Sequence, residues 1–373
     1  MGIIYFIMII TFILSIILTP LTIKFANKFG FVDIPKDNRR VHAKPMPRIG
    51  GLAIVISMFI GLLIYYLITI NVPSIEFSNK FFGYVIGAII ISVMGLIDDM
   101  VNLRARYKFV FQLIAGTIIY FYGISIEGIK IPFIYTDLID FGFLSFPVTL
   151  IWVIGVTNAV NLIDGLDGLA AGISAISATA LLTIFITTSA SLDAIVITAV
   201  LVGAVLGFLP FNFNPAKTFM GDVGSNFLGF TLAAVSILGF AKGYTLIAII
   251  APILTLGVPI FDTLFAMARR FLAGKPMLSP DGGHVHHRLL KRGFNQRQAV
   301  LMLYTITSVL CIVAVTIISA DIYKLMLLIC ATVTFVILGY VTTLKQRHIK
   351  QLDTSVEDVD KTKENVIEVE NKK

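Results

Sequence analysis

Carboxylate, amide and imidazole side chains gather at four places in an otherwise strongly apolar sequence. Ionisable groups at the ends of apolar helices are costly unless they line a wet cavity, pair with a cation or bind a metal, so they indicate a functional site. Several converging carboxylates repel one another, and hard oxygen ligands suit Mg²⁺, which also binds waters and substrate phosphates. We therefore predict a site for Mg²⁺, or for Mn²⁺ in its place, and for a phosphate-bearing substrate. The candidates are Asp98 and Asp99; Asn158, Asn161, Asp164 and Asp167; Asp222; and His284, His286, His287 and Arg288.

The segment from Asn158 to Gly168 is the densest of these clusters. Asn158 and Asn161 are three residues apart and share a helix face, and Asp164 and Asp167 continue the same spacing. The glycines beside the two aspartates let a ligand approach the backbone closely. Two alternatives stay open. One or two of the aspartates can be helix caps, since Asp98 ends a helix and Asp164 and Asp167 lie in a turn that opens the next span. The asparagines can instead hydrogen-bond between helices.

A short glycine-flanked turn runs from Met220 to Ser225 and contains Asp222. Such a turn presents backbone N–H groups and a helix N-terminus to an anion, and Asp222 adds a carboxylate for the metal. Asp262 is more ambiguous, because it either serves the site or pairs with a neighbouring helix.

The histidine cluster from His284 to Arg288 favours recognition of oxygen atoms over binding of zinc. No cysteine and no second histidine cluster completes a zinc shell. Histidine and arginine donate charge-assisted hydrogen bonds to sugar or diphosphate oxygens. Arg48 lies in a basic, proline-rich loop that offers similar donors, and the alternative for it is a cytoplasmic anchor.

The elements that must position these residues are membrane helices. Among 373 residues, 57% are apolar and 14% are charged, and the mean hydropathy is +0.92, which excludes a water-soluble chain. Apolar blocks of about 20 residues predict an all-α, polytopic protein with 10 or 11 transmembrane helices and disfavour a β-barrel. The expected spans are 3–23, 51–70, 81–97, 109–124, 143–163, 169–189, 193–211, 227–240, 244–267, 299–319 and 323–343.

The distribution of basic residues predicts the orientation in the membrane. With the N-terminus outside, all but four of the 29 lysines and arginines lie on the cytoplasmic side. Every polar cluster then follows an odd-numbered span and faces the cytoplasm. The net charge of +7 is explained by this asymmetry, so we expect no nucleic-acid partner. We expect one transmembrane domain over 1–343, a hairpin or short strand within 125–142, and a disordered cytoplasmic tail over 344–373.

Five ordered motifs resemble the polyprenyl-phosphate N-acetylhexosamine-1-phosphate transferases, bacterial membrane enzymes related to the phospho-MurNAc-pentapeptide translocases. The resemblance covers residues 33 to 300. Met100 departs from the pattern, because some relatives have a basic residue after the aspartate pair. The matching segments are Asp33-Ile34-Pro35 through Arg48-Ile49-Gly50-Gly51; Gly95–Asp99 with Leu103, Lys108 and Gln112; Asn158–Gly168; Met220–Ser225; and Gly283–Leu290.

The resemblance implies a role for each matching residue. Asp222 and Asn161 would hold Mg²⁺, and Asp98 and Asp99 would lie beside the attacking lipid phosphate. Lys108 would contact the diphosphate. Asp164 and Asp167 would lie at the nucleoside side, and the sugar would be recognised by His284, His286, His287 and Arg288. Asn158 and Arg48 are further implied substrate-binding residues.

The implied reaction transfers N-acetylglucosamine 1-phosphate from UDP-N-acetylglucosamine to undecaprenyl phosphate and releases UMP. It would start a lipid-linked glycan such as wall teichoic acid or O-antigen at the bacterial cell membrane. Direct attack by the lipid phosphate is favoured over a covalent aspartyl intermediate. The alternatives are the pentapeptide translocase reaction and a cation-coupled transporter. The oligomeric state is open between a monomer and a homodimer.

Overall fold

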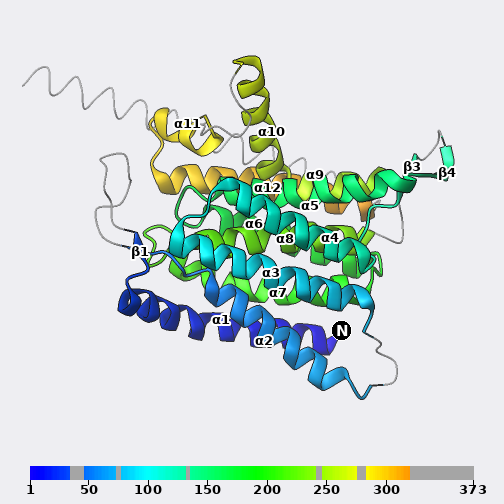
Figure 1. The fold of residues 1–373 in the computed structure, drawn as a ribbon, viewed down its shortest axis with the longest axis horizontal. Coiled ribbons are helices and arrows are strands. Elements are labelled where there is room, and N and C mark those ends of the chain that lie inside the picture. The colour runs from blue at the N-terminus through cyan, green and yellow to red at the C-terminus, as the bar shows by residue number, and fades with distance from the viewer. Residues whose placement is uncertain (34–45, 73–76, 132–134, 241–245, 275–282, 320–373) are drawn as a thin grey trace, which may run out of the picture. The chain divides into compact units, whose positions relative to one another are not determined.

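The computed structural model describes residues 1–33, 46–72, 77–131, 135–240, 246–274 and 283–319. The described part is predominantly helical, as the apolar blocks predict (Figure 1). The helices are α1 Gly2–Phe29, α2 Leu52–Thr69, α3 Asn79–Val101, α4 Ala105–Phe121, α5 Ser145–Ile163, α6 Leu169–Thr187, α7 Leu192–Asn212, α8 Gly221–Phe240, α9 Leu246–Thr255, α10 Gly257–Leu272, α11 Val285–Lys291 and α12 Gln296–Ser319. A 3₁₀ turn, Gly142–Leu144, leads into α5.

Eight helices in the described part are long and apolar enough to cross a membrane, namely α1, α2, α3, α5, α6, α7, α8 and α12. The prediction of an all-α, multi-pass membrane protein is thus confirmed. Helix α4, with 17 residues, occupies the position of the expected short span at 109–124. The expected span 323–343 and the tail 344–373 lie outside the described residues.

The prediction of one continuous span over 244–267 is wrong, because the chain there forms two helices, α9 and α10. Pro259 has no N–H to donate to the carbonyl of Thr255, which would be its helical partner. The Ser177 hydroxyl donates a hydrogen bond to this carbonyl, and the Cys311 thiol lies 3.8 Å from it. Helix α10 stands out from the neighbouring helices at a steep angle in Figure 1.

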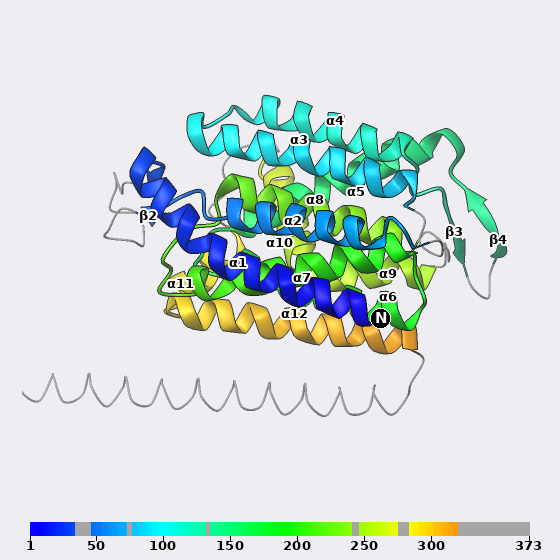
Figure 2. The same ribbon diagram turned by 90° about the horizontal axis from the view of Figure 1, so that it is seen from below.

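Helix α8 forms the centre of the bundle and contacts α3, α5, α6 and α7. In its most apolar stretch 89% of the residues are buried, against 28% in α1, at the lower edge of the bundle in Figure 1, and 28% in α12, at the lower edge in Figure 2. The exposed apolar side chains of α1, such as Phe6 and Ile13, suit contact with lipid. A polar residue on α8 therefore lies inside protein, where it must find protein partners.

Side-chain caps define the starts of α3 and α7. Ser78 accepts a hydrogen bond from the Phe81 N–H at 3.3 Å, and Ser191 accepts one from Ala194 at the same distance. Asp193, in the first turn of α7, accepts a hydrogen bond from the Ser78 hydroxyl, which joins these two helix ends.

Two short hairpins connect the helices. Strand β1, Val32–Asp33, pairs antiparallel with β2, Met46–Pro47. Strand β3, Gly128–Ile131, pairs antiparallel with β4, Tyr135–Asp140, which confirms the hairpin predicted within 125–142. The strand Met46–Pro47 leads directly to Arg48 and so helps to place that side chain.

Candidate active site

Asp222, in the first turn of α8, lies between two basic side chains. Its Oδ1 is 3.3 Å from Lys108 Nζ, and its Oδ2 is 3.2 Å from Arg48 Nη2. Each cation also reaches one member of the aspartate pair: Lys108 pairs with Asp98, and Arg48 Nε lies 3.2 Å from Asp99 Oδ1. The structure thus brings together three aspartates and two cations from four separate segments.

The aspartate pair at the end of α3 also binds backbone N–H groups. Asp99 Oδ1 accepts from the N–H of Asp222 and Asp99 Oδ2 from that of Val223, both at 2.9 Å. Asp98 Oδ1 accepts from the Leu103 N–H at 2.7 Å. Asp99 therefore caps α8 and Asp98 caps the turn into α4, so for this pair the capping alternative holds together with the ion pairs.

Amide side chains, half-buried on α5 and buried on α4 and α8, join these three helices. Asn161 Nδ2 donates to Asp222 Oδ1 at 2.9 Å and to Ser225 Oγ at 2.8 Å. Asn158 Nδ2 donates to Gln112 Oε1 on α4 at 2.8 Å, and Gln112 Nε2 donates to Asn226 Oδ1 at 3.2 Å. Because Gln112 and Asn226 are buried and find their partners within the protein, the network helps to fix the position of Asp222 relative to α4 and α5.

The loop that carries Arg48 lies along the turn before α8. Phe219 N–H donates to the Pro47 carbonyl at 2.8 Å, and Gly50 N–H donates back to the Phe219 carbonyl at 3.0 Å. At Gly221 φ is +71°, and a Cβ there would lie 2.2 Å from the Arg48 carbonyl. Glycine is therefore required at this position for the loop and the turn to pack.

Asp164 and Asp167 point to different surroundings. Asp167 is buried, and its Oδ2 accepts from Asn214 Nδ2 at 3.0 Å and from the Ala216 N–H at 3.1 Å, both in the connection between α7 and α8. Asp164, at the C-terminal end of α5, lies close enough to Asp222 for their charges to interact. Loss of contact with water, followed by repulsion from Asp222 and other carboxylates, raises the pKa of Asp164 to about 8.

The histidine cluster packs against the turn between α5 and α6. A Cβ on Gly165 would lie 2.4 Å from His286 Nε2, so the imidazole rests directly on that glycine. Burial, and then the neighbouring His287, lower the pKa of His286 to about 4, so its ring is neutral at pH 7. His284 is buried beside Asp262 on α10, whereas Arg288 is exposed. The cluster is thus beside Asp164, on the side of the turn that leads to α6.

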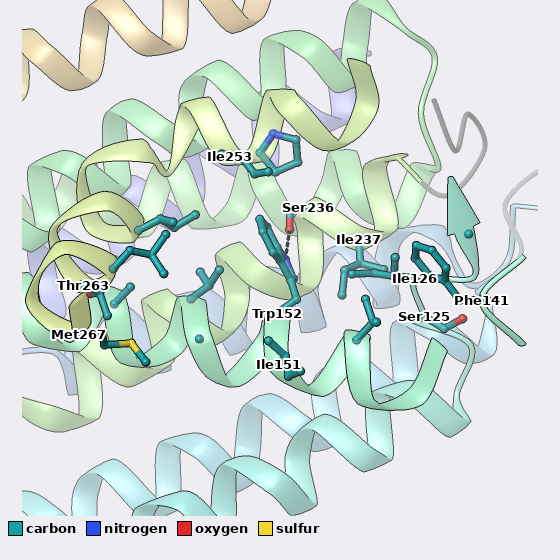
Figure 3. A pocket seen from close by; sticks show the side chains of 18 residues that line it. Ser125, Ile126, Phe141, Ile151, Trp152, Ser236, Ile237, Ile253, Thr263 and Met267 are labelled. Carbon is teal, nitrogen blue, oxygen red and sulfur yellow. Dashed lines mark hydrogen bonds between the residues drawn. The ribbon is translucent and has the colours of Figure 1, made fainter. Parts of the chain in front are cut away.

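An apolar groove runs between α5, α8, α9 and α10, with a cavity volume of about 600 Å³ (Figure 3). Its walls include Ile151, Ile237 and Ile253, and Trp152 Nε1 donates to Ser236 Oγ at 3.0 Å within it. The groove extends along α5 to Ala159, in the helical turn that also carries the two asparagines. Along α5 the groove thus ends at the level of the asparagines, although Ala159 lies on a different face of the helix from Asn161.

The charges of the cluster fit a divalent cation. Among the described residues, Lys108 and Arg48 pair with three carboxylates, those of Asp98, Asp99 and Asp222, which leaves an excess of one negative charge when all are ionised. Asp164 lies close enough to Asp222 and Asp99 to add to this negative charge when it is ionised. No group of three histidine, cysteine or acidic residues in the described ranges has the arrangement of a closed metal shell. One carboxylate and one amide match the sparse protein ligation typical of Mg²⁺.

Three contributions were missed or left open by the sequence reasoning. Gln112 was named only as part of a matching segment, without a role. Asn226 was not named, because it lies one residue beyond the segment Met220–Ser225. The signal for Asn226 was its spacing of four residues from Asp222 on an apolar helix, which places both side chains on one face. Asp262 was ambiguous, and the structure pairs it with His284.

The chain is similar in sequence to a known family and to several named proteins. The model of glycosyl transferase family 4 matches residues 81–240. A Bacillus subtilis protein named probable undecaprenyl-phosphate N-acetylglucosaminyl 1-phosphate transferase is 39% identical over 92% of this chain and 93% of its own length. The decaprenyl-phosphate N-acetylglucosaminephosphotransferase of Mycolicibacterium smegmatis is 34% identical over 75% of this chain and 73% of its own.

A more distant relative is the phospho-N-acetylmuramoyl-pentapeptide-transferase of Halalkalibacterium halodurans, 31% identical over 80% of this chain and 92% of its own. The family resemblance drawn from the five motifs is therefore confirmed. This chain is a multi-pass membrane protein that belongs to glycosyl transferase family 4.

Proposed function

We propose that this protein transfers N-acetylglucosamine 1-phosphate from UDP-N-acetylglucosamine to undecaprenyl phosphate, releases UMP and so starts a cell-envelope glycan. The observation that carries the proposal is the position of Asp222 between Lys108 and Arg48, in a protein whose helix α5 lines an apolar groove and also supplies Asn161 to Asp222. A transferase with one lipid and one water-soluble substrate needs both features together. The printed names of the relatives support the same reaction.

The groove between α5 and α10 would hold the polyprenyl chain. Its walls are mainly aliphatic and aromatic, with hydroxyl groups from Ser125, Ser236 and Thr263, and such an apolar lining suits an isoprenoid better than a sugar. With the chain in the groove, the phosphate of the lipid would lie toward the turn of α5 that carries Asn161. Binding would thus supply the proximity that the reaction requires.

In the reaction, an oxygen of the lipid phosphate attacks the phosphorus that carries the sugar. A new phosphoanhydride bond forms, the bond to the bridging oxygen of the nucleotide breaks, and that oxygen leaves with UMP. Lys108 and Arg48 would offset the repulsion between the two anions and stabilise charge on the leaving phosphate. Asp98 would hold Lys108 in place, and Asp99 would hold the N-terminus of α8.

Asp222 and Asn161 would hold Mg²⁺, which supplies Lewis-acid polarisation of the phosphate oxygens when bound. The Asn161 side chain would use its carbonyl oxygen for this, since Nδ2 already donates to Asp222 and Ser225. The protein's own part is to keep a carboxylate and an amide at fixed positions through the Gln112 network.

The hydrogen bonding of the aspartate pair supports direct displacement. A covalent route needs a carboxylate oxygen that is free to attack phosphorus. Both oxygens of Asp99 accept backbone N–H bonds, and Asp98 binds Leu103 N–H and Lys108. A lipid phosphate is already anionic at neutral pH, so it needs no covalent relay.

We propose that the N-terminus lies outside a bacterial cell membrane and that the site and the C-terminus face the cytoplasm. The asymmetry of lysine and arginine supports this orientation. The site would then draw on cytoplasmic nucleotide sugar and on lipid from the bilayer.

The test uses purified protein in detergent with undecaprenyl phosphate, Mg²⁺ and labelled UDP-N-acetylglucosamine. We expect equal amounts of UMP and lipid-extractable label, both lost with EDTA and with Asp222→Ala. Asp193→Asn is the matched control. Asp193 is in the first turn of α7 and accepts a hydrogen bond from Ser78, so this substitution should leave turnover unchanged.

Two other outcomes of this assay would indicate a different function. Product only from UDP-N-acetylmuramoyl-pentapeptide would replace the proposed substrate with that of the translocases. Absence of UMP from every UDP-sugar, with folded protein, would contradict the transferase and favour a transporter.

A further inference from the structure

Asp262 on α10 binds two successive groups at the start of the histidine cluster. Its Oδ2 lies 2.8 Å from His284 Nδ1, and its Oδ1 accepts from the Val285 N–H at 2.8 Å. Asp262 is 3% exposed and His284 is 5% exposed. Since both carboxylate oxygens are used, Asp262 attaches the start of α11 to α10.

The same contact determines which nitrogen of His284 carries the proton. An ionised carboxylate can only accept hydrogen bonds, so Nδ1 must be the donor. In the neutral ring Nε2 then has a lone pair and can only accept. The rings of His284 and His286 are stacked with centroids 5.8 Å apart and planes 7° from parallel, which holds the orientation of His284 further.

We propose that Asp262 is a positioning residue that fixes His284 with Nδ1 protonated, so that Nε2 accepts a hydrogen bond from a hydroxyl or amide N–H of the sugar. This inference rests on the proposed function and goes beyond it by assigning an acceptor to the sugar subsite. Helix α10 also contributes Ile260, Thr263 and Leu264 to the apolar groove. One helix thus helps to form the subsites of both substrates.

The variant Asp262→Asn separates the two contacts of this carboxylate. The asparagine Oδ1 can still accept from the Val285 N–H, so the attachment of α11 is retained. Its Nδ2 then faces His284 Nδ1 as a donor, which forces the proton of the ring to Nε2. We expect kcat/KM for the UDP-sugar to fall about 10- to 100-fold, as for other groups that orient a histidine, with the KM for the lipid unchanged.

A double-mutant cycle tests whether Asp262 acts through His284. In a His284→Gln background the ring is gone, so Asp262→Asn should lower kcat/KM by less than about twofold. The matched control is Asn295→Ala, which removes a side-chain cap from the nearby α12 without contact to His284. This control should leave the preference among UDP-sugars unchanged. Equal effects of Asp262→Asn in both backgrounds would overturn the proposal.

A measurement that does not depend on turnover tests the role of Asp262 separately from the transferase reaction. Nitrogen-15 NMR of histidine-labelled protein in detergent reports the tautomer of each ring, and His284→Gln assigns the signal. We expect a proton on Nδ1 of His284 in the unaltered protein and on Nε2 in Asp262→Asn. A proton on Nε2 in both would overturn the inference even if the enzyme is active. The expected tautomers in a protein without turnover would instead contradict only the transferase function.

Discussion

The carboxylate of Asp99 accepts a hydrogen bond from the backbone N–H of Asp222 at 2.9 Å. Its second oxygen binds the next N–H along α8, and its side chain is completely buried. Asp99 therefore determines where α8 begins and hence where Asp222 lies between its two cations. Asp99 thus positions the start of α8, a role that its place in the sequence motif did not predict.

Asp99→Ala should lower both stability and activity. It leaves two buried N–H groups at the start of α8 and the Arg48 guanidinium without an acceptor, at a cost of about 2–4 kcal/mol. The measurement is thermal unfolding in detergent, with Asp222→Ala as the comparison because that side chain is more exposed. A melting temperature of Asp99→Ala equal to that of the unaltered protein would contradict the capping role.

Arg48→Gln should slow turnover but allow Mg²⁺ to bind more tightly. Removing a cation 3.2 Å from Asp222 Oδ2 takes away a charge that repels the metal. We expect the Mg²⁺ concentration for half-maximal activity to fall about three- to tenfold while kcat falls about 100-fold. Lys217→Gln is the control, because this exposed lysine contacts the Phe211 ring instead. A higher Mg²⁺ requirement in Arg48→Gln would contradict the expectation.

Asp164 should make the metal-free protein less stable as the pH rises. Its pKa of about 8 in the folded protein is above the ordinary value of 3.8, so the folded state binds this proton more tightly. The stabilisation is complete below about pH 3.8 and is lost as the pH rises through about 8. Melting temperatures in EDTA should therefore decline between pH 6 and pH 9, and less steeply in Asp164→Asn. Parallel curves for the two proteins would contradict this assignment.

Gly155→Leu should raise the KM for the lipid by about tenfold and leave that for the UDP-sugar unchanged. Gly155 lines the groove, and a Cβ there meets no atom within 4 Å, so the larger side chain fills the groove without a clash in the fold. Loss of apolar contact for part of an isoprenoid costs about 1–2 kcal/mol. Equal effects on both substrates would place the lipid elsewhere.

The same groove can be observed directly through Trp152, the only tryptophan of the chain. Addition of undecaprenyl phosphate should shift its fluorescence in a saturable way, and UDP alone should not. Gly155→Leu should weaken the response. A spectrum that does not change with the lipid would count against the groove as its binding site.

The sequence by itself determined the membrane class, most of the spans and the polar motifs. Blocks of about 20 apolar residues predict helices because a bilayer requires that length, and a spacing of three or four residues fixes a shared helix face. The shared helix face of Asn158 and Asn161 could be predicted in this way. The segment Met220–Ser225 was predicted as a turn ahead of a helix, whereas in the structure α8 already begins at Gly221 and includes Asp222. The orientation of the chain in the membrane stays a prediction of its basic residues.

Only the tertiary structure decided which side chains meet across helices. Arg48 and Asp222 are 174 residues apart, and their contact depends on the packing of the loop before α2 against the turn before α8. The carbonyl of Thr255, at the break between α9 and α10, likewise finds its partners on other helices, in Ser177 and Cys311. Local spacing acts within one element, whereas these partners are selected by the burial of backbone and charged groups that water cannot reach.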